Sequence, residues 1–151
     1  MKTKKLKLVI DRAKWQRGSI YGDEAYLLDP ESKKMCCLGF LSRACGLGPK
    51  TIQGLDCPAT SELNTKAKEK LMKNPYSSWL FDEDGDFDTA QSDDCVKAIN
   101  FNDRNVTESF TERDREKRIK TLFAKHNISV TFKGKNDAKR ISGMQIRTDP
   151  E

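Results

Sequence analysis

The sequence lacks the features of a membrane or secreted protein. None of its apolar runs approaches the roughly 20 residues that a helix needs to cross a bilayer. The start of the chain is basic like a signal peptide, but the charged residues Asp11, Arg12 and Lys14 interrupt the apolar stretch that follows Leu6–Ile10. The length of 151 residues is ordinary for one domain. We therefore expect a cytoplasmic protein with a single globular domain over residues 1–134.

Metal-binding and disulfide motifs are also missing. The sequence has no CxxC pair and only one histidine, so it offers no zinc-site spacing. Its five cysteines are an odd number at irregular spacings, whereas a secreted disulfide framework normally has an even number. We expect reduced thiols that pack as small hydrophobic side chains, and neither a metal nor a cofactor. The cysteines are Cys36, Cys37, Cys45, Cys57 and Cys95.

One acidic segment partly matches a calcium-binding loop. Residues 82–93 are acidic at positions one, three, five and seven, as in an EF-hand. The sixth position is Phe87, where the EF-hand needs glycine for a sharp turn, and Asp93 at position twelve is shorter than the bidentate glutamate. We therefore interpret the segment as a solvated acidic loop. The acidic positions are Asp82, Asp84, Asp86 and Asp88.

Positive charge is concentrated at the two ends of the chain. The net charge is +5 overall, with +6 in residues 1–20, +4 in residues 100–151 and −5 in residues 21–99. Basic ends attract nucleotides, nucleic acid or an acidic protein surface. A nucleic-acid binder would use the basic side chains within Lys2–Lys7 and Arg113–Lys125. No nucleic-acid module is recognisable in the sequence.

Hydrophobic spacing and capping residues predict a mostly helical α+β domain. Apolar residues recur at i, i+3, i+4 and i+7 between Leu6 and Ala13, which predicts a first helix up to about Trp15. Ser92 and Thr111 are typical N-cap residues, and each precedes a helical pattern. The other predicted helices are Met35–Cys45, a segment from Thr60 or Ser61 to Lys73, Ser92–Ile99 and Thr111–Lys125.

Strand signals are few, and the clearest one is near the end of the chain. Ile128–Phe132 alternates between apolar and polar residues, as a half-buried strand does. Ile141–Ile146 could return beside it within a tail of residues 135–151, which predicts a short hairpin or small sheet towards the C-terminus. Ala25–Leu28 is a second short strand candidate, and Asn102–Asn105 has the composition of a turn.

Cys37 and His126 suggest an enzymatic alternative. Cys37 lies in a predicted helix, and a thiol near a helix N-terminus is favoured as the thiolate by the helix dipole. Cys37–Leu41 resembles the cysteine helix of papain-like peptidases of the NlpC/P60 type, which also have a histidine at the start of a strand. The resemblance implies a cysteine hydrolase with Cys37 as nucleophile and His126 as base. The structural alternative is a buried cysteine and a histidine that caps a helix.

A wider pattern resembles small uncharacterised proteins of bacteriophages and their bacterial hosts. Members have a Cys-Cys-Leu-Gly or Cys-Leu-Leu-Gly helix in the first half and an Asn-Asp turn before a closing helix. The resemblance covers residues 12–125 and implies a phage accessory protein that counters host defences or redirects host machinery. It is carried by Trp15–Gly18, Leu28–Pro30, Cys36–Leu41 and Ile99–Asp103.

The shared residues allow a structural and a ligand-binding interpretation. In the structural one, Gly39 permits close helix packing, Trp15 anchors the first helix and Asn102 forms a turn or cap. In the other, an aromatic ring stacks on a base and guanidinium groups bind phosphate. We expect binding rather than catalysis, with a nucleotide, another anionic small molecule or a host protein as partner. The candidate ligand-binding residues are Trp15, Arg17, Arg43, Asn102, Asp103 and Arg104.

Overall fold

Helices are the main regular structure of the fold, as the sequence predicts. The computed structural model describes residues 4–18, 26–59, 62–82 and 91–135. Within these residues no helix is both long and apolar enough to span a membrane. The elements are β1 (Leu6–Asp11), the 3-10 turn η1 (Arg12–Lys14), α1 (Cys37–Ala44), α2 (Pro49–Ile52), α3 (Thr65–Lys73), the 3-10 turn η2 (Ser78–Leu80), α4 (Asp93–Asp103), α5 (Glu112–Ala124) and β2 (Ile128–Lys133).

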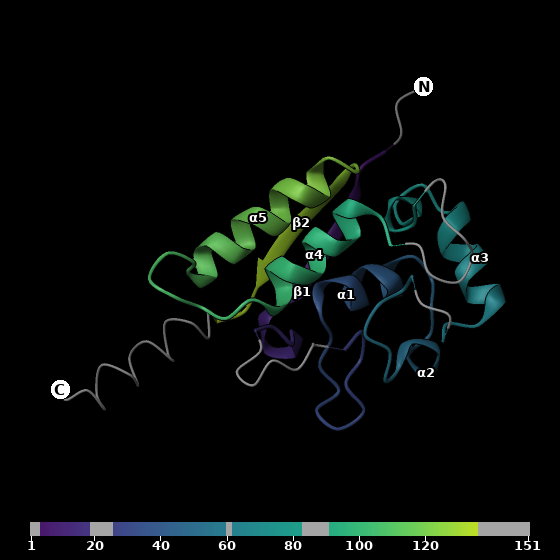
Figure 1. The fold of residues 1–151 in the computed structure, drawn as a ribbon, viewed down its shortest axis with the longest axis horizontal. Helices are drawn as coiled ribbons and strands as arrows, with labels where there is room; N and C mark the ends of the chain where they lie inside the picture. Colours follow the sequence, from purple (N-terminus) through teal and green to yellow (C-terminus); the bar gives the residue numbers. More distant parts are fainter. Residues whose placement is uncertain (1–3, 19–25, 60–61, 83–90, 136–151) are drawn as a thin grey trace.

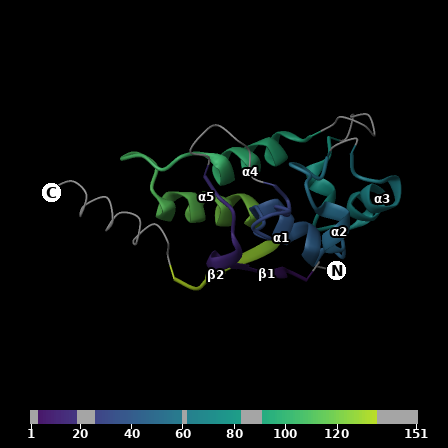
Figure 2. The ribbon, with the colours of Figure 1, turned by 90° about the horizontal axis from the view of Figure 1, so that it is seen from below.

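The elements form layers over one side of a small sheet (Figures 1 and 2). Seen from below, β1 and β2 form the lowest layer, α1 and α5 lie on it, and α4 lies above them (Figure 2). The short helices α2 and α3 lie together at one end of the molecule (Figure 1). One apolar cluster connects the layers, with residues from the sheet, the helices and the connecting loops.

The N-terminal segment is a strand, which corrects the helix predicted up to Trp15. Leu8 and Ile10 are buried, whereas Lys7 and Val9 between them are exposed. This burial has the period of two that defines a strand with one covered face. The same apolar residues also fit a helical spacing, so periodicity alone could not separate the two structures.

The strand β2 is confirmed, but its partner differs from the predicted hairpin. β1 and β2 pair in parallel, with Leu6 opposite Ile128 and Asp11 opposite Lys133. The sheet therefore joins the two ends of the described chain instead of lying only towards the C-terminus. The predicted returning strand Ile141–Ile146 lies outside the described residues.

Capping residues position the helices largely as predicted. The Ser92 hydroxyl accepts a hydrogen bond from the Cys95 N–H and begins α4. Thr111 and Asp114 form a capping box at the start of α5. One turn is corrected, because Asn102 and Asp103 belong to the last turn of α4.

Two further segments differ from their predictions. Helix α3 starts at Thr65 with Asn64 as its N-cap, while the predicted caps Thr60 and Ser61 lie outside the described residues. In the described part of Ala25–Leu28, Leu28 forms only an isolated bridge with Gln53, so no strand develops there.

Close packing of α1 depends on Gly39. A Cβ atom at this position would lie 1.9 Å from the Leu27 carbonyl oxygen, far inside van der Waals contact. The helix can therefore approach the backbone of the preceding loop only because residue 39 has no side chain. This confirms the structural interpretation of the glycine in the Cys-Cys-Leu-Gly segment.

Candidate functional site

Asn102 joins three parts of the chain through its side chain. Its Oδ1 accepts hydrogen bonds from the Trp15 indole N–H at 2.8 Å and from the Cys37 backbone N–H at 2.9 Å. Its Nδ2 donates to the Gln16 carbonyl and to Asp103 Oδ1, both at 3.0 Å. An amide side chain can make four hydrogen bonds, so this one has no capacity left for a ligand. We call this group the Asn102 junction.

A buried ion cluster lies next to the Asn102 junction. Glu112 Oε1 accepts from Arg17 Nε at 2.9 Å and from Arg115 Nε at 3.0 Å. Arg115 is fully buried, and its Nη1 donates to the carbonyls of Phe101 and Asn102 at 2.7 Å each. These bonds satisfy the C-terminal carbonyls of α4, which would otherwise be without helical partners. The cluster therefore fixes α5 against the end of α4.

The structure brings four of the six predicted ligand-binding residues together, but in the interior. Trp15 is 2% exposed, and the Arg17 guanidinium carbon lies 4.4 Å from the centroid of the Trp15 ring. Asn102 and Asp103 complete the same group. Because the indole is buried and Arg17 pairs with Glu112, the geometry fits the structural interpretation better than a ligand pocket.

The other two predicted residues have partners outside the Asn102 junction. Arg104 packs its guanidinium over the Phe110 ring, 4.5 Å from the centroid. Arg43 is on the exposed side of α1, where its Nη1 donates to the Leu47 carbonyl at 3.0 Å. Among the described residues, the contacts of Arg43 and Arg104 are therefore separate from those of Trp15, Arg17, Asn102 and Asp103.

Cys37 is enclosed in the core. Its side chain is fully buried, and its thiol lies 3.8 Å from the Ala98 carbonyl oxygen. Burial raises the pKa of Cys37 well above its usual value, and the neighbouring Cys36 raises it further. A nucleophilic cysteine needs the opposite environment, with an accessible sulfur and a stabilised thiolate. The surroundings of Cys37 therefore fit the structural alternative.

His126 has partners other than Cys37. Its Nε2 lies 2.7 Å from Asp94 Oδ2, and its ring stacks on Trp79 with centroids 4.2 Å apart. Among the described residues, no hydrogen bond joins the imidazole to the Cys37 thiol. The pair proposed for a cysteine hydrolase is therefore not assembled in this structure.

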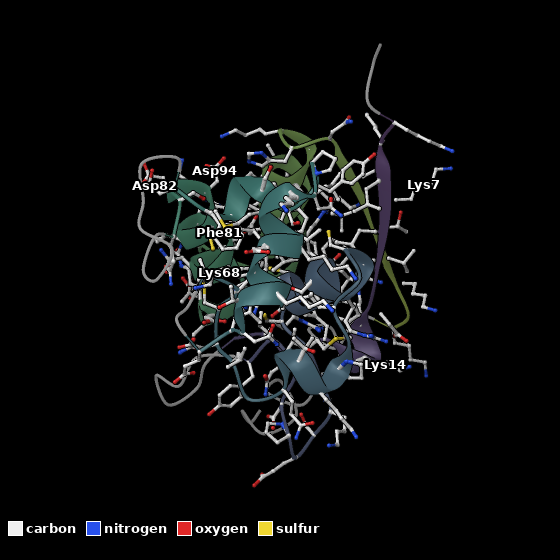
Figure 3. The ribbon with its side chains drawn as sticks, turned by 90° about the vertical axis from the view of Figure 1, so that its right-hand side faces the viewer. Lys7, Lys14, Lys68, Phe81, Asp82 and Asp94 are labelled. Carbon is white, nitrogen blue, oxygen red and sulfur yellow. The ribbon has the colours of Figure 1, made fainter. Side chains whose placement is uncertain are left out.

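A basic groove lies beside α1, between the loop that precedes it and the start of α2. Its volume is about 460 Å³, within the range of small-molecule sites. Four cationic side chains line it, and no acidic residue of the described chain does. Figure 3 shows Lys14 at the end of β1, on the side of the molecule opposite Asp82 and Asp94. The lining residues are Ala13, Lys14, Leu28, Ser32, Lys33, Lys34, Met35, Arg43 and Pro49.

The loop that carries Lys33 and Lys34 is held by Asp29. The Asp29 carboxylate accepts from the Glu31 N–H at 2.9 Å and from Gln16 Nε2 at 2.7 Å. Hydrogen bonding to the Glu31 backbone lowers the pKa of Asp29, although its partial burial acts in the opposite direction. Lys33 has a φ of 63°, and its N–H donates to the Asp29 carbonyl at 2.9 Å. This tight turn brings both lysines to the edge of the groove.

Sequence reasoning found Arg43 but missed the three lysines. Lys14 lies within the helix predicted up to Trp15, and no prediction includes Lys33 or Lys34. The available signal was the pair of adjacent lysines after the Asp-Pro turn. That signal becomes specific only when folding places Lys14 and Arg43 opposite them.

The described residues contain no cluster of three or more metal-ligating side chains. The calcium-loop hypothesis concerns residues 82–93, of which 83–90 lie outside the described residues. The hypothesis is therefore neither supported nor opposed by the structure.

No protein-family model, curated protein or solved structure matches the chain. The resemblance to phage proteins therefore stays a prediction from short motifs. The geometry and charge of the surface are therefore the basis for inferring a function.

Proposed function

We propose that the protein is a small binding protein that captures an anionic, nucleotide-like ligand in the basic groove. The observation that carries the proposal is the convergence of Lys14, Lys33, Lys34 and Arg43 on a single concave surface with no acidic lining residue among the described residues. Such a positively charged surface attracts anionic ligands, and Arg and Lys are the residues that usually bind phosphate groups.

The groove also offers an apolar surface for the rest of such a ligand. Leu28, Met35 and Pro49 lie among the lining residues, and Ser32 adds a hydroxyl. A phosphate would be held by the cations while a ring lies against the apolar side chains. Trp15 has no part in this recognition because it is buried in the Asn102 junction.

The biological setting is part of the proposal. The motifs that resemble phage proteins suggest an accessory protein in the cytoplasm of the host cell. Capture of a nucleotide signal would serve to counter a host defence. The function requires binding alone, which agrees with the enclosed position of Cys37.

A melting assay with a panel of mononucleotides, dinucleotides and cyclic nucleotides tests the proposal. A ligand at 100 times its dissociation constant stabilises a protein by about 2.7 kcal/mol, which corresponds to several degrees in Tm. We expect at least one nucleotide to raise the Tm, and we expect the double variant Lys14→Glu, Lys34→Glu to abolish the rise.

The control variant places the same charge change elsewhere. Arg113 and Lys120 are exposed on α5 and do not line the groove. The double variant Arg113→Glu, Lys120→Glu should keep the nucleotide response. If no nucleotide in the panel changes the Tm of the wild-type protein, the proposal is wrong.

A further inference from the structure

A second concave surface lies between α4 and α5. It has a volume of about 390 Å³ and shares no lining residue with the basic groove. Phe101 from α4 contributes apolar surface to it, whereas Leu122 from α5 borders it but is only 5% exposed. Its remaining lining residues are Lys97, Asp114, Lys117, Arg118, Thr121 and Lys125. We call this surface the α4–α5 groove.

The α4–α5 groove has a net positive charge. Four of its side chains are cationic and one is acidic. The acidic one, Asp114, already accepts hydrogen bonds from the Thr111 N–H at 3.0 Å and from the Thr111 hydroxyl at 3.1 Å. The groove therefore presents an excess of positive charge to its surroundings.

The cations of the groove differ in what they already bind. Lys97 and Lys125 both pair with Asp94, at 3.9 Å and 3.2 Å. Lys117 and Arg118 are exposed, and neither forms a salt bridge with a carboxylate among the described residues. Lys117 and Arg118 can therefore form salt bridges with the carboxylates of a partner.

The apolar part of the groove indicates whether its partner is a protein or a nucleic acid. The Arg118 guanidinium lies 5.7 Å from the centroid of the Phe101 ring, so charge and apolar surface are in direct contact. A phosphodiester backbone would use the cations but would gain nothing from the apolar side chain of Phe101. A peptide with carboxylates beside apolar side chains would use both. The combination therefore favours a protein partner over nucleic acid.

The shape of the groove suits one helix. Its α5 wall runs from Asp114 to Lys125, a length of about 16 Å at 1.5 Å per residue. Residues 118, 121, 122 and 125 follow the helical spacing of one continuous face. A helix of about three turns matches this length, with an apolar stripe on the groove floor and acids at the rim.

We infer that the α4–α5 groove binds an acidic amphipathic helix of a partner protein. Recognition comes from apolar contact with Phe101 and from carboxylates that face Lys117 and Arg118. The site shares no residue with the basic groove, so an occupant of one does not cover the lining of the other.

Fluorescence anisotropy with designed peptides tests this inference. The probe is a fluorescein-labelled peptide of about 16 residues, rich in Glu, with Leu at i, i+3, i+4 and i+7. Comparison peptides are a scrambled sequence of the same composition and a version with Lys in place of Glu. We expect the acidic amphipathic peptide to bind about tenfold more tightly than the scrambled one, and the Lys version not to bind.

Charge-reversal variants test whether the peptide binds in the α4–α5 groove. Lys117→Glu with Arg118→Glu should weaken binding of the acidic peptide at least about tenfold. The double variant Arg113→Glu, Lys120→Glu makes the same charge change on the same helix, outside the groove, and should retain binding. Circular dichroism of each variant confirms that these exposed substitutions leave the fold intact.

Three outcomes would overturn the inference. One is equal binding of the amphipathic and scrambled peptides, which would mean that charge alone attracts them. Another is equal loss of binding in the two double variants, which would remove the groove from the explanation. The third is failure of the acidic peptide to bind while labelled duplex DNA binds through Lys117 and Arg118, which would identify the surface as a nucleic-acid contact.

Discussion

The side-chain amide of Asn102 shows how one polar residue can organise a small core. It is 1% exposed and has a partner for each of its hydrogen-bonding capacities. Aspartate would supply no donor to the Gln16 carbonyl, and leucine would leave the Trp15 and Cys37 N–H groups without an acceptor. A buried polar group without a hydrogen-bond partner lowers the stability of the fold. Position 102 therefore requires a side chain that both accepts and donates hydrogen bonds, as the asparagine amide does.

Replacement of Asn102 should therefore be strongly destabilising. We expect Asn102→Ala to lower the free energy of unfolding by about 2 to 4 kcal/mol, because it leaves several buried polar groups unpaired. Urea denaturation measures this value. Asn100→Ala, an exposed position in the same helix, should change it by less than about 0.5 kcal/mol. Similar losses in the two variants would show that the Asn102 junction does not stabilise the fold.

The cysteines allow a second test at the scale of single residues. All five are buried, and burial raises the pKa of Cys36 to about 12. The pKa values of Cys37, Cys45 and Cys95 are also raised. Since the thiolate is the reactive form, we expect Ellman's reagent at neutral pH to react slowly with the native protein and with all five thiols after denaturation. Rapid reaction of Cys37 in the native protein would restore the hydrolase alternative.

Among the elements, α1 depends most on a single position. Gly39→Ala places a methyl group against the Leu27 carbonyl oxygen, so the helix must move away from the preceding loop. We expect a loss of more than about 2 kcal/mol in the free energy of unfolding, measured by urea denaturation.

A matched glycine provides the control for α1. Gly48 precedes α2 with a φ of −76°, and an added Cβ would meet nothing within 4 Å. Gly48→Ala should therefore stay within about 1 kcal/mol of the wild-type protein. If Gly39→Ala were equally harmless, the close approach between α1 and the loop would be wrong.

The capping box of α5 predicts a pH dependence. Hydrogen bonding to the Thr111 backbone and then to its hydroxyl lowers the pKa of Asp114 below its usual value. A carboxyl whose pKa is lower in the folded state stabilises the fold above its unfolded pKa, and this contribution is lost as the pH falls through the folded pKa. The free energy of unfolding should therefore fall between about pH 4 and pH 2, and less steeply for Asp114→Asn. An equal decline for both proteins in urea titrations would contradict this role.

Local signals identified some elements but not β1. The serine and threonine caps of α4 and α5 act within four residues, so the sequence alone contains the full signal. β1 instead depends on β2, which lies at the other end of the described chain. Leu8 and Ile10 fit a strand or a helix until that partner covers one of their faces.

The candidate site likewise combines features that local sequence signals predict with features that only tertiary contacts determine. Trp15 and Asn102 were selected for their residue types, and the structure places both in an interior contact that no local pattern specifies. Arg43 was selected as a guanidinium, and it lines the basic groove with three lysines from other parts of the chain. Burial decides which of these side chains can meet a ligand, and burial follows from tertiary packing.

At the scale of the whole molecule, the polar groups that stabilise the fold lie in the interior. The charged groups that can contact a ligand or partner lie on the surface. The Asn102 junction and the Glu112 cluster use their polar groups against one another in the interior. The lysines of the basic groove and the α4–α5 groove remain on the surface. Cationic side chains thus line two concave surfaces of different composition.

The central claim is that an anionic ligand occupies the basic groove. Nuclear magnetic resonance tests it by following each backbone amide of the ¹⁵N-labelled protein during titration with the nucleotide that raises the Tm most. We predict saturable chemical-shift changes at Lys33, Lys34 and Arg43, with little change at Lys117 and Arg118 on α5. Saturable changes at Lys117 and Arg118 with none at Lys33, Lys34 and Arg43 would contradict the claim.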